Sequence, residues 1–202
     1  MNHVYSMLDL FSGLGGASEA MLNYGWEVRR YDNNPLLQHV PNTIIHDVTK
    51  IHANPHPDGL KMTLVWASPP CLDFSTGFNA PGPTAKRSGL NFQPDLSPML
   101  EAKRIIDEIN PRFWCIENVI GSIKHFEPYL GTPRLIVGSF VLYGNFPLFD
   151  ARDVKHNKSD VDPGPSNPLR ANYRAKVPYA LSDALRQAIE NQTSLFDMFD
   201  LS

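Results

Sequence analysis

The stretch Val4-Tyr-Ser-Met-Leu-Asp-Leu-Phe-Ser-Gly-Leu-Gly-Gly16 decides the fold. Its apolar part, Val4 to Leu10, predicts a buried β-strand, and the amphipathic residues Ala17 to Tyr24 predict a helix directly after the glycines. Glycines at such a turn let the backbone approach a ligand closely, and the start of the helix offers unpaired N–H groups. A tight strand-to-helix turn without a ligand is the alternative interpretation.

Working outward, the same alternation of strand and helix patterns repeats. A helical period covers Ser97 to Ile109, with Ser97 as the expected N-cap and Pro98 in the first turn. Further strands are predicted at Trp26–Tyr31, Thr43–His46, Thr63–Ala67 and Phe113–Ile116. This alternation predicts an α/β protein with a mostly parallel, twisted sheet and helices on both faces. Ligands bind such sheets beyond the carboxyl ends of the strands, where the polar clusters of this sequence fall.

The remaining segments complete a single domain. Residues 72–93 are rich in glycine and proline and predict a long loop, and residues 135–149 predict a hairpin or two strands. We divide the chain into a catalytic and cofactor-binding part (1–150), a basic loop as a reduced recognition region (151–176), a helix that packs back on it (177–190, with its helical period over Pro178 to Ile189) and an unassigned tail (191–202).

Composition excludes several classes of protein. The 202 residues are 42% hydrophobic and 19% charged with a net charge of -3, as in a globular protein of one domain. No membrane span or secretory signal is apparent in the sequence, so we expect a soluble, intracellular (cytoplasmic) protein without membrane contact. Two cysteines make no disulfide framework, and no Cys/His spacing predicts a metal site.

Four side chains at strand ends are candidates for chemistry. Cys71 follows a strand and two prolines, where a nucleophilic thiol beside a mobile loop belongs, although most lone cysteines are inert and buried. Glu117 ends the next predicted strand, and Cys115 within that strand is interpreted as core. Asp32 ends the second strand at the distance typical of an acid that binds ribose hydroxyls. For Asp47, an adenine contact and an ordinary surface position are equally supported.

These residues carry a resemblance. Asp9-Leu-Phe-Ser-Gly-Leu-Gly-Gly16, Pro69-Pro-Cys-Leu-Asp-Phe-Ser75 and Glu117-Asn-Val119 occur in the order and spacing of the cytosine-C5 DNA methyltransferase family, and Val177-Pro-Tyr-Ala-Leu-Ser-Asp-Ala-Leu185 resembles its closing helix. The resemblance implies a Rossmann-like class I methyltransferase fold and S-adenosylmethionine as cofactor, released as S-adenosylhomocysteine. It implies cofactor contacts from Asp9, Phe11, Ser12, Gly13, Gly15, Gly16, Asp32, Asn33, Asp47, Val48 and Pro69.

The resemblance also implies a mechanism on cytosine in DNA. Cys71 attacks carbon 6, Glu117 protonates N3, and carbon 5 then accepts the methyl group from a base flipped out of the duplex. Asn118 is expected to set the active-site loop. Leu72 stands where the family usually has Gln, and Arg134 is the one candidate remnant of a Gln-x-Arg-x-Arg element. The family's large target-recognition domain has no counterpart in these 202 residues.

Nucleic-acid contacts must therefore come from smaller segments. We expect phosphate contacts from the basic loop, with an ordinary solvated loop as the equal alternative. The expected contacts are Ser75, Lys86, Arg87, Arg152, Lys155, Arg170, Arg174 and Lys176. DNA is the expected partner, and a homodimer or an accessory recognition chain is left open. The alternatives are an RNA cytosine methyltransferase of the transfer-RNA type, transfer of another one-carbon unit, and an inactive relative that binds nucleic acid or a catalytic partner.

Overall fold

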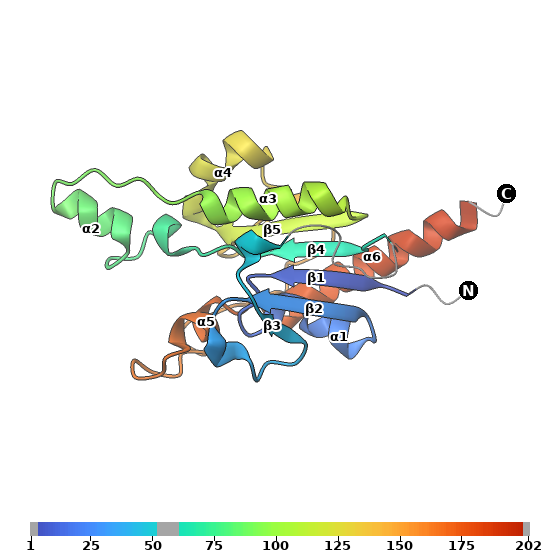
Figure 1. The fold of residues 1–202 in the computed structure, drawn as a ribbon. Coiled ribbons are helices and arrows are strands. Elements are labelled where there is room, and N and C mark those ends of the chain that lie inside the picture. The colour runs from blue at the N-terminus through green and yellow to red at the C-terminus, as the bar shows by residue number, and fades with distance from the viewer. Residues whose placement is uncertain (1–3, 52–60, 200–202) are drawn as a thin grey trace.

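The computed structural model describes residues 4–51 and 61–199, and the side chains of the last helix as far as residue 192. Within these residues a seven-stranded sheet has the order β3-β2-β1-β4-β5-β7-β6 (Figure 1). Strands β1 to β5 are parallel, β7 is antiparallel to β5, and β6 is antiparallel to β7. The strands are β1 Ser6–Leu10, β2 Glu27–Asp32, β3 Thr43–Ile45, β4 Leu64–Ala67, β5 Phe113–Val119, β6 Leu135–Val137 and β7 Phe140–Asn145. The predicted α/β class with a mostly parallel sheet is confirmed.

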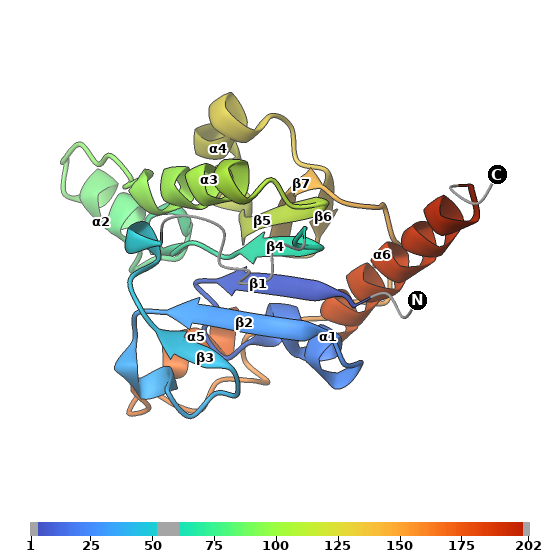
Figure 2. The same cartoon turned by 45° about the vertical axis from the view of Figure 1, so that its right-hand side comes forward.

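Helices cover both faces of this sheet (Figures 1 and 2). The α-helices are α1 Glu19–Asn23, α2 Pro81–Arg87, α3 Ser97–Ile109, α4 Ile123–Leu130, α5 Arg170–Ala175 and α6 Tyr179–Phe199. Short 3-10 turns are η1 Gly16–Ser18, η2 Pro35–Leu37, η3 Val48–Lys50, η4 Leu72–Phe74 and η5 Ile120–Ser122. No helix in the described ranges combines the length and apolar character needed to cross a membrane.

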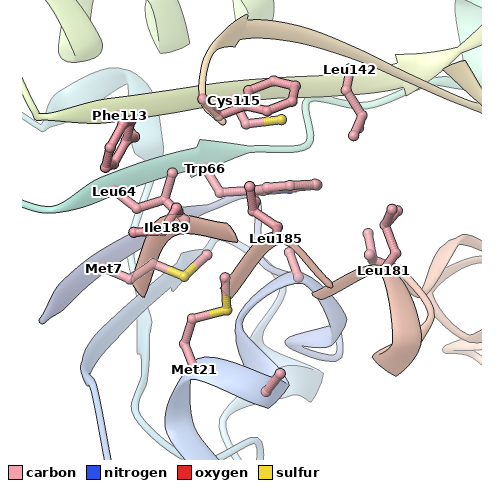
Figure 3. Close-up of a cluster of buried hydrophobic side chains, with 14 of the residues drawn as sticks. Met7, Met21, Leu64, Trp66, Phe113, Cys115, Leu142, Leu181, Leu185 and Ile189 are labelled. Carbon is pink, nitrogen blue, oxygen red and sulfur yellow. The ribbon is translucent and has the colours of Figure 1, made fainter. Parts of the chain in front are cut away.

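Alternating side chains of each strand divide the interior into two cores. Met7 and Trp66 face α1 and α6, where Leu181, Leu185 and Ile189 pack against them (Figure 3). Neighbouring strand residues such as Leu8 and Val65 face α3 and α4 on the opposite side. Period-2 alternation with both faces buried is what a parallel sheet between two helical layers requires. Cys115 is fully buried in the first core, which confirms its interpretation as a packing residue.

The segment 72–93, predicted as a loop without regular structure, contains η4 and α2. Pro81 stands in the first turn of α2, where a missing N–H costs no hydrogen bond. The helix has no buried residue and therefore no apolar period that the sequence could reveal. Similarly, the predicted basic loop contains α5, and α6 continues past Ile189 to Phe199 through most of the unassigned tail.

Two predicted boundaries were also wrong. Ser97 is the first residue of α3 rather than its N-cap, and its N–H donates to Asp95 Oδ1 (2.9 Å). Strand β5 continues past Ile116 to Val119 because antiparallel pairing with β7 extends it, with Glu117 opposite Leu142. Local sequence shows a polar Glu-Asn pair and gives no sign of this distant partner.

Candidate active site

The loop that carries Cys71 is fixed to β5 by Asn118. β4 and β5 are parallel neighbours, so their carboxyl ends lie at one edge of the sheet. Asn118 is buried, and its side-chain amide donates to the carbonyl of Pro69 (3.0 Å). Its Oδ1 accepts from the N–H of Val119 (2.9 Å), which holds the amide in place. The two prolines and Cys71 are thus brought to the edge at which Glu117 lies.

A second contact, which sequence reasoning missed, lies between Gly121 and Phe74. A Cβ at Gly121 would lie 2.0 Å from the carbonyl oxygen of Phe74, so η5 and η4 approach to a distance that only glycine permits. The Phe74 ring packs edge-on against Phe126 with 4.9 Å between centroids. The root of the Cys71 loop is therefore anchored in the core behind α4.

This close approach gives a first prediction. Gly121→Ala should lower the free energy of unfolding by about 1–3 kcal/mol, because the added methyl group must push η4 and η5 apart. Gly77→Ala is the matched control, since its Cβ would meet Ser75 Oγ at a tolerable 3.4 Å. Denaturant melts of both variants measure the difference, and equal stability of the two would contradict this account of the glycine.

Burial sets the protonation of both candidate catalytic groups. It raises the pKa of the half-buried Cys71 thiol, and the charge of Glu117 adds to this effect. Burial also raises the pKa of Glu117 to about 7, although a hydrogen bond from Ser68 lowers this pKa in part. Glu117 can therefore act as an acid near neutral pH, as a proton donor requires.

Lys158 is a further residue of this edge. Its positive charge lowers the pKa of both Cys71 and Glu117, so its ammonium lies near enough to act on the two groups. Lys158 is exposed, in a segment with few regular elements. Nothing in the local sequence pattern distinguishes Lys158 from other surface lysines, so the sequence did not mark it as a site residue.

The glycine turn lies at the carboxyl end of β1. Gly13 and Gly15 have φ angles of +53° and +71°, which glycine adopts without strain. The N–H of Gly13 donates to Asp32 Oδ2 (2.9 Å), so the acid at the end of β2 reaches the turn. Ser12 Oγ is buried here and has no hydrogen-bond partner among the described residues. A turn with an acid and an unpaired hydroxyl fits a polar nucleoside ligand.

The buried side chains of Asp9 and Arg30 support this turn. Asp9 is fully buried, accepts a hydrogen bond from Ser18 Oγ (2.5 Å), and has its pKa raised to about 6, chiefly by burial. The Arg30 guanidinium donates to Ser18 Oγ (2.8 Å) and to the carbonyl of Gly15 (3.1 Å). A Cβ at Gly15 would lie 2.4 Å from Arg30 Cζ. This buried arginine, which the sequence analysis did not single out, shapes the turn.

The other predicted cofactor residues differ in their surroundings. Asn33 is exposed and Val48 is buried. Asp47 caps η3, where its Oδ1 accepts from the N–H (3.0 Å) and the hydroxyl (2.8 Å) of Thr49. These contacts favour the surface interpretation of Asp47. Phe11 has a φ of 56° at the end of β1, and Gly16 begins η1.

Four of the eight predicted nucleic-acid residues have acidic partners. Arg170 and Arg174 both pair with Asp162, Arg152 pairs with Asp150, and Lys176 pairs with Glu19. In the described part of the chain, no ion pair is recorded for Lys155 or Lys158. Lys86 and Arg87 end α2, which extends beyond the sheet (Figure 1), and Arg87 lies 3.8 Å from the centroid of the exposed Phe78 ring. Ser75 Oγ accepts from the N–H of Gly77 (3.2 Å).

Arg134 lies apart from the other catalytic candidates. It directly precedes β6, the strand at the end of the sheet, and its Nε donates to the carbonyl of Phe146 (2.6 Å). Its guanidinium lies 5.7 Å from the centroid of the Phe146 ring. Among the described residues, no recorded contact joins Arg134 to Cys71 or Glu117, and its observed contacts hold the β7 end in place.

Of three solved structures that are similar to this chain, one has a TM-score above 0.5 and shows the same fold. The Entamoeba histolytica methyltransferase EhMeth is 15% identical with a TM-score of 0.51, over 82% of this chain and 62% of that chain. A protein encoded within an E. coli prophage and assigned as a DNA modification methyltransferase is 17% identical with a TM-score of 0.47, over 81% and 56% of the two chains. A mutant of Spodoptera frugiperda DNMT2 is 17% identical with a TM-score of 0.39, over 81% of this chain and 61% of that chain.

The chain spans between 56% and 62% of the length of these structures. No curated protein sequence matches it significantly. The profile of the C-5 cytosine-specific DNA methylases, in contrast, matches residues 5–130, a range that contains the glycine turn, Cys71 and Glu117. Because this match covers well over half of the chain, the protein belongs to the C-5 cytosine-specific DNA methylase family.

Proposed function

We propose that this protein transfers a methyl group from S-adenosylmethionine to carbon 5 of cytosine in DNA, with Cys71 as nucleophile and Glu117 as acid. The observation that carries the proposal is the hydrogen bond from Asn118 to Pro69 (3.0 Å), which joins the Cys71 loop to the strand that bears Glu117. The carboxyl of Glu117, with its pKa raised to about 7, can donate a proton at neutral pH. Neither feature is needed by a protein that only binds nucleic acid.

The chemistry follows from these two side chains. The Cys71 thiolate forms a bond to carbon 6 of cytosine, and Glu117 donates its proton to N3, so that the electron pair of the ring reaches carbon 5. S-adenosylmethionine, when bound, supplies the electrophilic methyl group and leaves as S-adenosylhomocysteine. A base then removes the proton from carbon 5, N3 returns its proton to Glu117, and the carbon–sulfur bond breaks to return the thiolate. Asn118 acts as a positioning residue for Cys71.

The residues of the glycine turn fit the cofactor. Asp32 offers carboxylate oxygens suited to ribose hydroxyls, and the unpaired Ser12 hydroxyl lies at the same turn. We propose that Phe11, Gly13, Gly15, Gly16 and Pro69 line the cofactor site, with Asp9 and Arg30 beneath it. The contacts of Asp47 make it the weakest member of this set.

One experiment tests substrate and product together. The protein is incubated with methyl-labelled S-adenosylmethionine and either duplex DNA, single-stranded DNA or RNA, and the nucleosides are analysed by mass spectrometry. We expect labelled 5-methyl-2′-deoxycytidine. If labelled 5-methylcytidine forms from RNA and no labelled nucleoside forms from DNA, the substrate is RNA. If no labelled nucleoside forms from any of the three substrates, the proposed catalysis is refuted. Light scattering of the same sample tests whether the protein forms a homodimer, which the sequence leaves open.

The ion pairs change the proposal for nucleic-acid binding. Arg170 and Arg174 share the single negative charge of Asp162, and Lys176 pairs with Glu19, so two of these three positive charges are compensated. Lys158 is exposed and acts electrostatically on Cys71 and Glu117. We therefore propose that Lys158, with Lys155, contacts phosphates near the target base.

The prediction for Lys158 follows. Lys158→Gln should weaken nucleic-acid binding to a similar extent for all sequences, and should lower the slope of log K against log salt by about one unit, because one phosphate contact is lost. Lys103→Gln on α3 is the control of equal charge change, since Lys103 is occupied by Asp107 (2.6 Å). Fluorescence anisotropy at several salt concentrations measures both slopes. The same slope for the two variants would remove Lys158 from the interface.

A further inference from the structure

The last helix, α6, continues past the body of the protein. Leu181, Leu185 and Ile189 pack into the first core, and no later residue with a described side chain belongs to that core. Glu190 accepts a hydrogen bond from Trp26 Nε1 (2.8 Å), and Trp26 directly precedes β2, so α6 reaches the amino edge of the sheet here. Figures 1 and 2 both show the remaining turns of α6 beyond that edge.

Ion pairs fix the base of this projection. Arg186 is buried and pairs with Asp183 (2.8 Å) and with Glu190. Its guanidinium lies 3.6 Å from the centroid of the Tyr24 ring, directly after α1. From this base α6 continues to Phe199, which is about 13 Å further along the helix axis. The projecting turns therefore start from a fixed point at the edge opposite to the active site.

The sequence of these turns carries one apolar helical face. Gln192, Leu195, Phe196 and Phe199 stand at positions i, i+3, i+4 and i+7, which lie on one side of an α-helix. This is the spacing of the residues with which a helix docks into an apolar groove. In neither view does another labelled element of the described chain lie beside these turns, so the groove must belong to a second protein.

Charge favours a different protein over a second copy of this chain. From Gln187 onward the sequence contains Glu190, Asp197 and Asp200 and neither Lys nor Arg. Two copies joined through this segment would bring like charges together, which costs free energy. A groove with a basic rim complements the segment instead.

We propose that residues 192–199 dock on the sliding clamp, the ring-shaped protein that encircles DNA during replication. The carboxamide of Gln192 can donate and accept hydrogen bonds in a polar pocket, and the adjacent Leu195 and Phe196 offer an aliphatic and an aromatic side chain to an apolar cleft. The choice of this partner rests on the proposed function, because a clamp is useful only to a protein that acts on DNA.

Docking on a clamp compensates for weak DNA binding by the chain itself. The protein has a net charge of -3, and Arg170, Arg174 and Lys176 have acidic partners. A clamp around the duplex holds the enzyme at a high effective concentration of DNA without further contacts. Because α6 projects from the amino edge of the sheet, the carboxyl edge with Cys71 and Glu117 stays open to the duplex.

Isothermal titration calorimetry of the whole protein with the purified sliding clamp of its own cell tests the assignment. We expect binding that the double change Leu195→Ala and Phe196→Ala weakens by about tenfold or more, because two apolar anchors are lost. Met198→Ala is the matched control, since position 198 lies off this helical face, and it should stay within about twofold of wild type. Thermal melts confirm that each variant is folded.

Two results would overturn the proposal. One is the absence of clamp binding by the wild-type protein, and the other is equal affinity of the double variant and Met198→Ala. If light scattering shows instead a homodimer that the double variant loses, and no clamp binding is found, the apolar face joins two copies of the chain.

Binding and catalysis are measured separately, so failures can be told apart. If the wild-type protein binds the clamp but methylates no cytosine in DNA, the docking of α6 stands and the proposed function fails. If it methylates DNA but does not bind the clamp, the proposed function stands and this inference fails. On circular DNA with a loaded clamp the wild type should methylate faster than the double variant, whereas without the clamp their rates should be equal.

Discussion

Replacing Cys71 with serine should reduce methyl transfer by more than about 10³-fold while cofactor affinity stays within about twofold of wild type. A serine hydroxyl is a far weaker nucleophile than a thiolate at neutral pH, and without a bond to carbon 6 the neighbouring carbon 5 cannot attack the methyl donor. The cofactor turn is built from other residues, at the carboxyl end of β1, so the substitution leaves it intact. Labelled methyl transfer and calorimetry measure the two quantities.

Cys115 supplies the control for this experiment. Cys115→Ala removes the other thiol of the chain from a fully buried position, so it should lower stability and retain transfer at a temperature where the variant is folded. A trapped product gives a second readout. DNA containing 5-fluorocytosine should form a covalent adduct with wild type, since fluorine cannot leave as a proton, and none with Cys71→Ser. Substantial turnover by the serine variant would exclude Cys71 as the nucleophile.

Changing Glu117 to glutamine should lower kcat/KM by about 10²–10⁴-fold, the usual effect of losing a general acid or base. Glutamine keeps the shape of the side chain but cannot donate a proton to N3 of cytosine. Asn118→Ala is a useful comparison, because it should lower the rate by loosening the Cys71 loop without removing the acid. An unchanged rate in Glu117→Gln, together with lower thermal stability, would instead support a structural role for this carboxylate.

The pH dependence of the reaction gives an independent test of Glu117. The pKa of Glu117 is raised to about 7, and the pKa of the Cys71 thiol is raised above 9.0. The reactive form of the enzyme has a protonated Glu117 and a Cys71 thiolate, so the two groups together hold one of their two protons. kcat/KM should therefore rise with pH through about 7 and fall again above the thiol pKa. In Glu117→Gln the rise should move up to the pKa of the thiol.

Stability should respond to pH through the same carboxyl. Because the pKa of Glu117 is higher in the folded protein (about 7) than its ordinary value of 4.5, stability is lost as pH rises from about 4.5 to 7 and is constant above that. Glu117→Gln lacks this ionisation. The wild-type protein should thus lose stability relative to the variant over that window, which thermal melts at pH 5 and pH 8 would reveal.

The sequence by itself determined the parts that depend on local pattern. Apolar periods within a few neighbouring residues predict the strands β1, β2, β4 and β7 and the helix α3. The backbone freedom of glycine predicts the glycine turn. The order of the polar clusters along the chain placed the glycine turn and Cys71 at strand ends, and it placed Glu117 just past the point where the parallel pairing of β5 with β4 ends. Because parallel strands share their carboxyl edge, that placement sufficed to predict one common site.

Tertiary structure alone decided which polar groups are paired. The basic residues of 151–176 were predicted to bind nucleic acid, but Asp162 and Glu19 engage the arginines of α5 and Lys176. Arg30 and Gly121 act through close approach to Gly15 and Phe74, which no local pattern shows. The extension of β5 likewise needed its antiparallel partner, β7.

The physical reason is the range of the interactions involved. Hydrophobic periods and turn preferences depend on a few neighbouring residues, so they can be predicted from the sequence. Ion pairs, pKa shifts and steric contacts depend on distances between segments that the fold alone brings together, as Asn172 and Gly13 are. The sequence therefore determined the edge of the sheet at which the chemistry is expected, and the tertiary structure decided which charges and hydrogen-bonding groups remain free there.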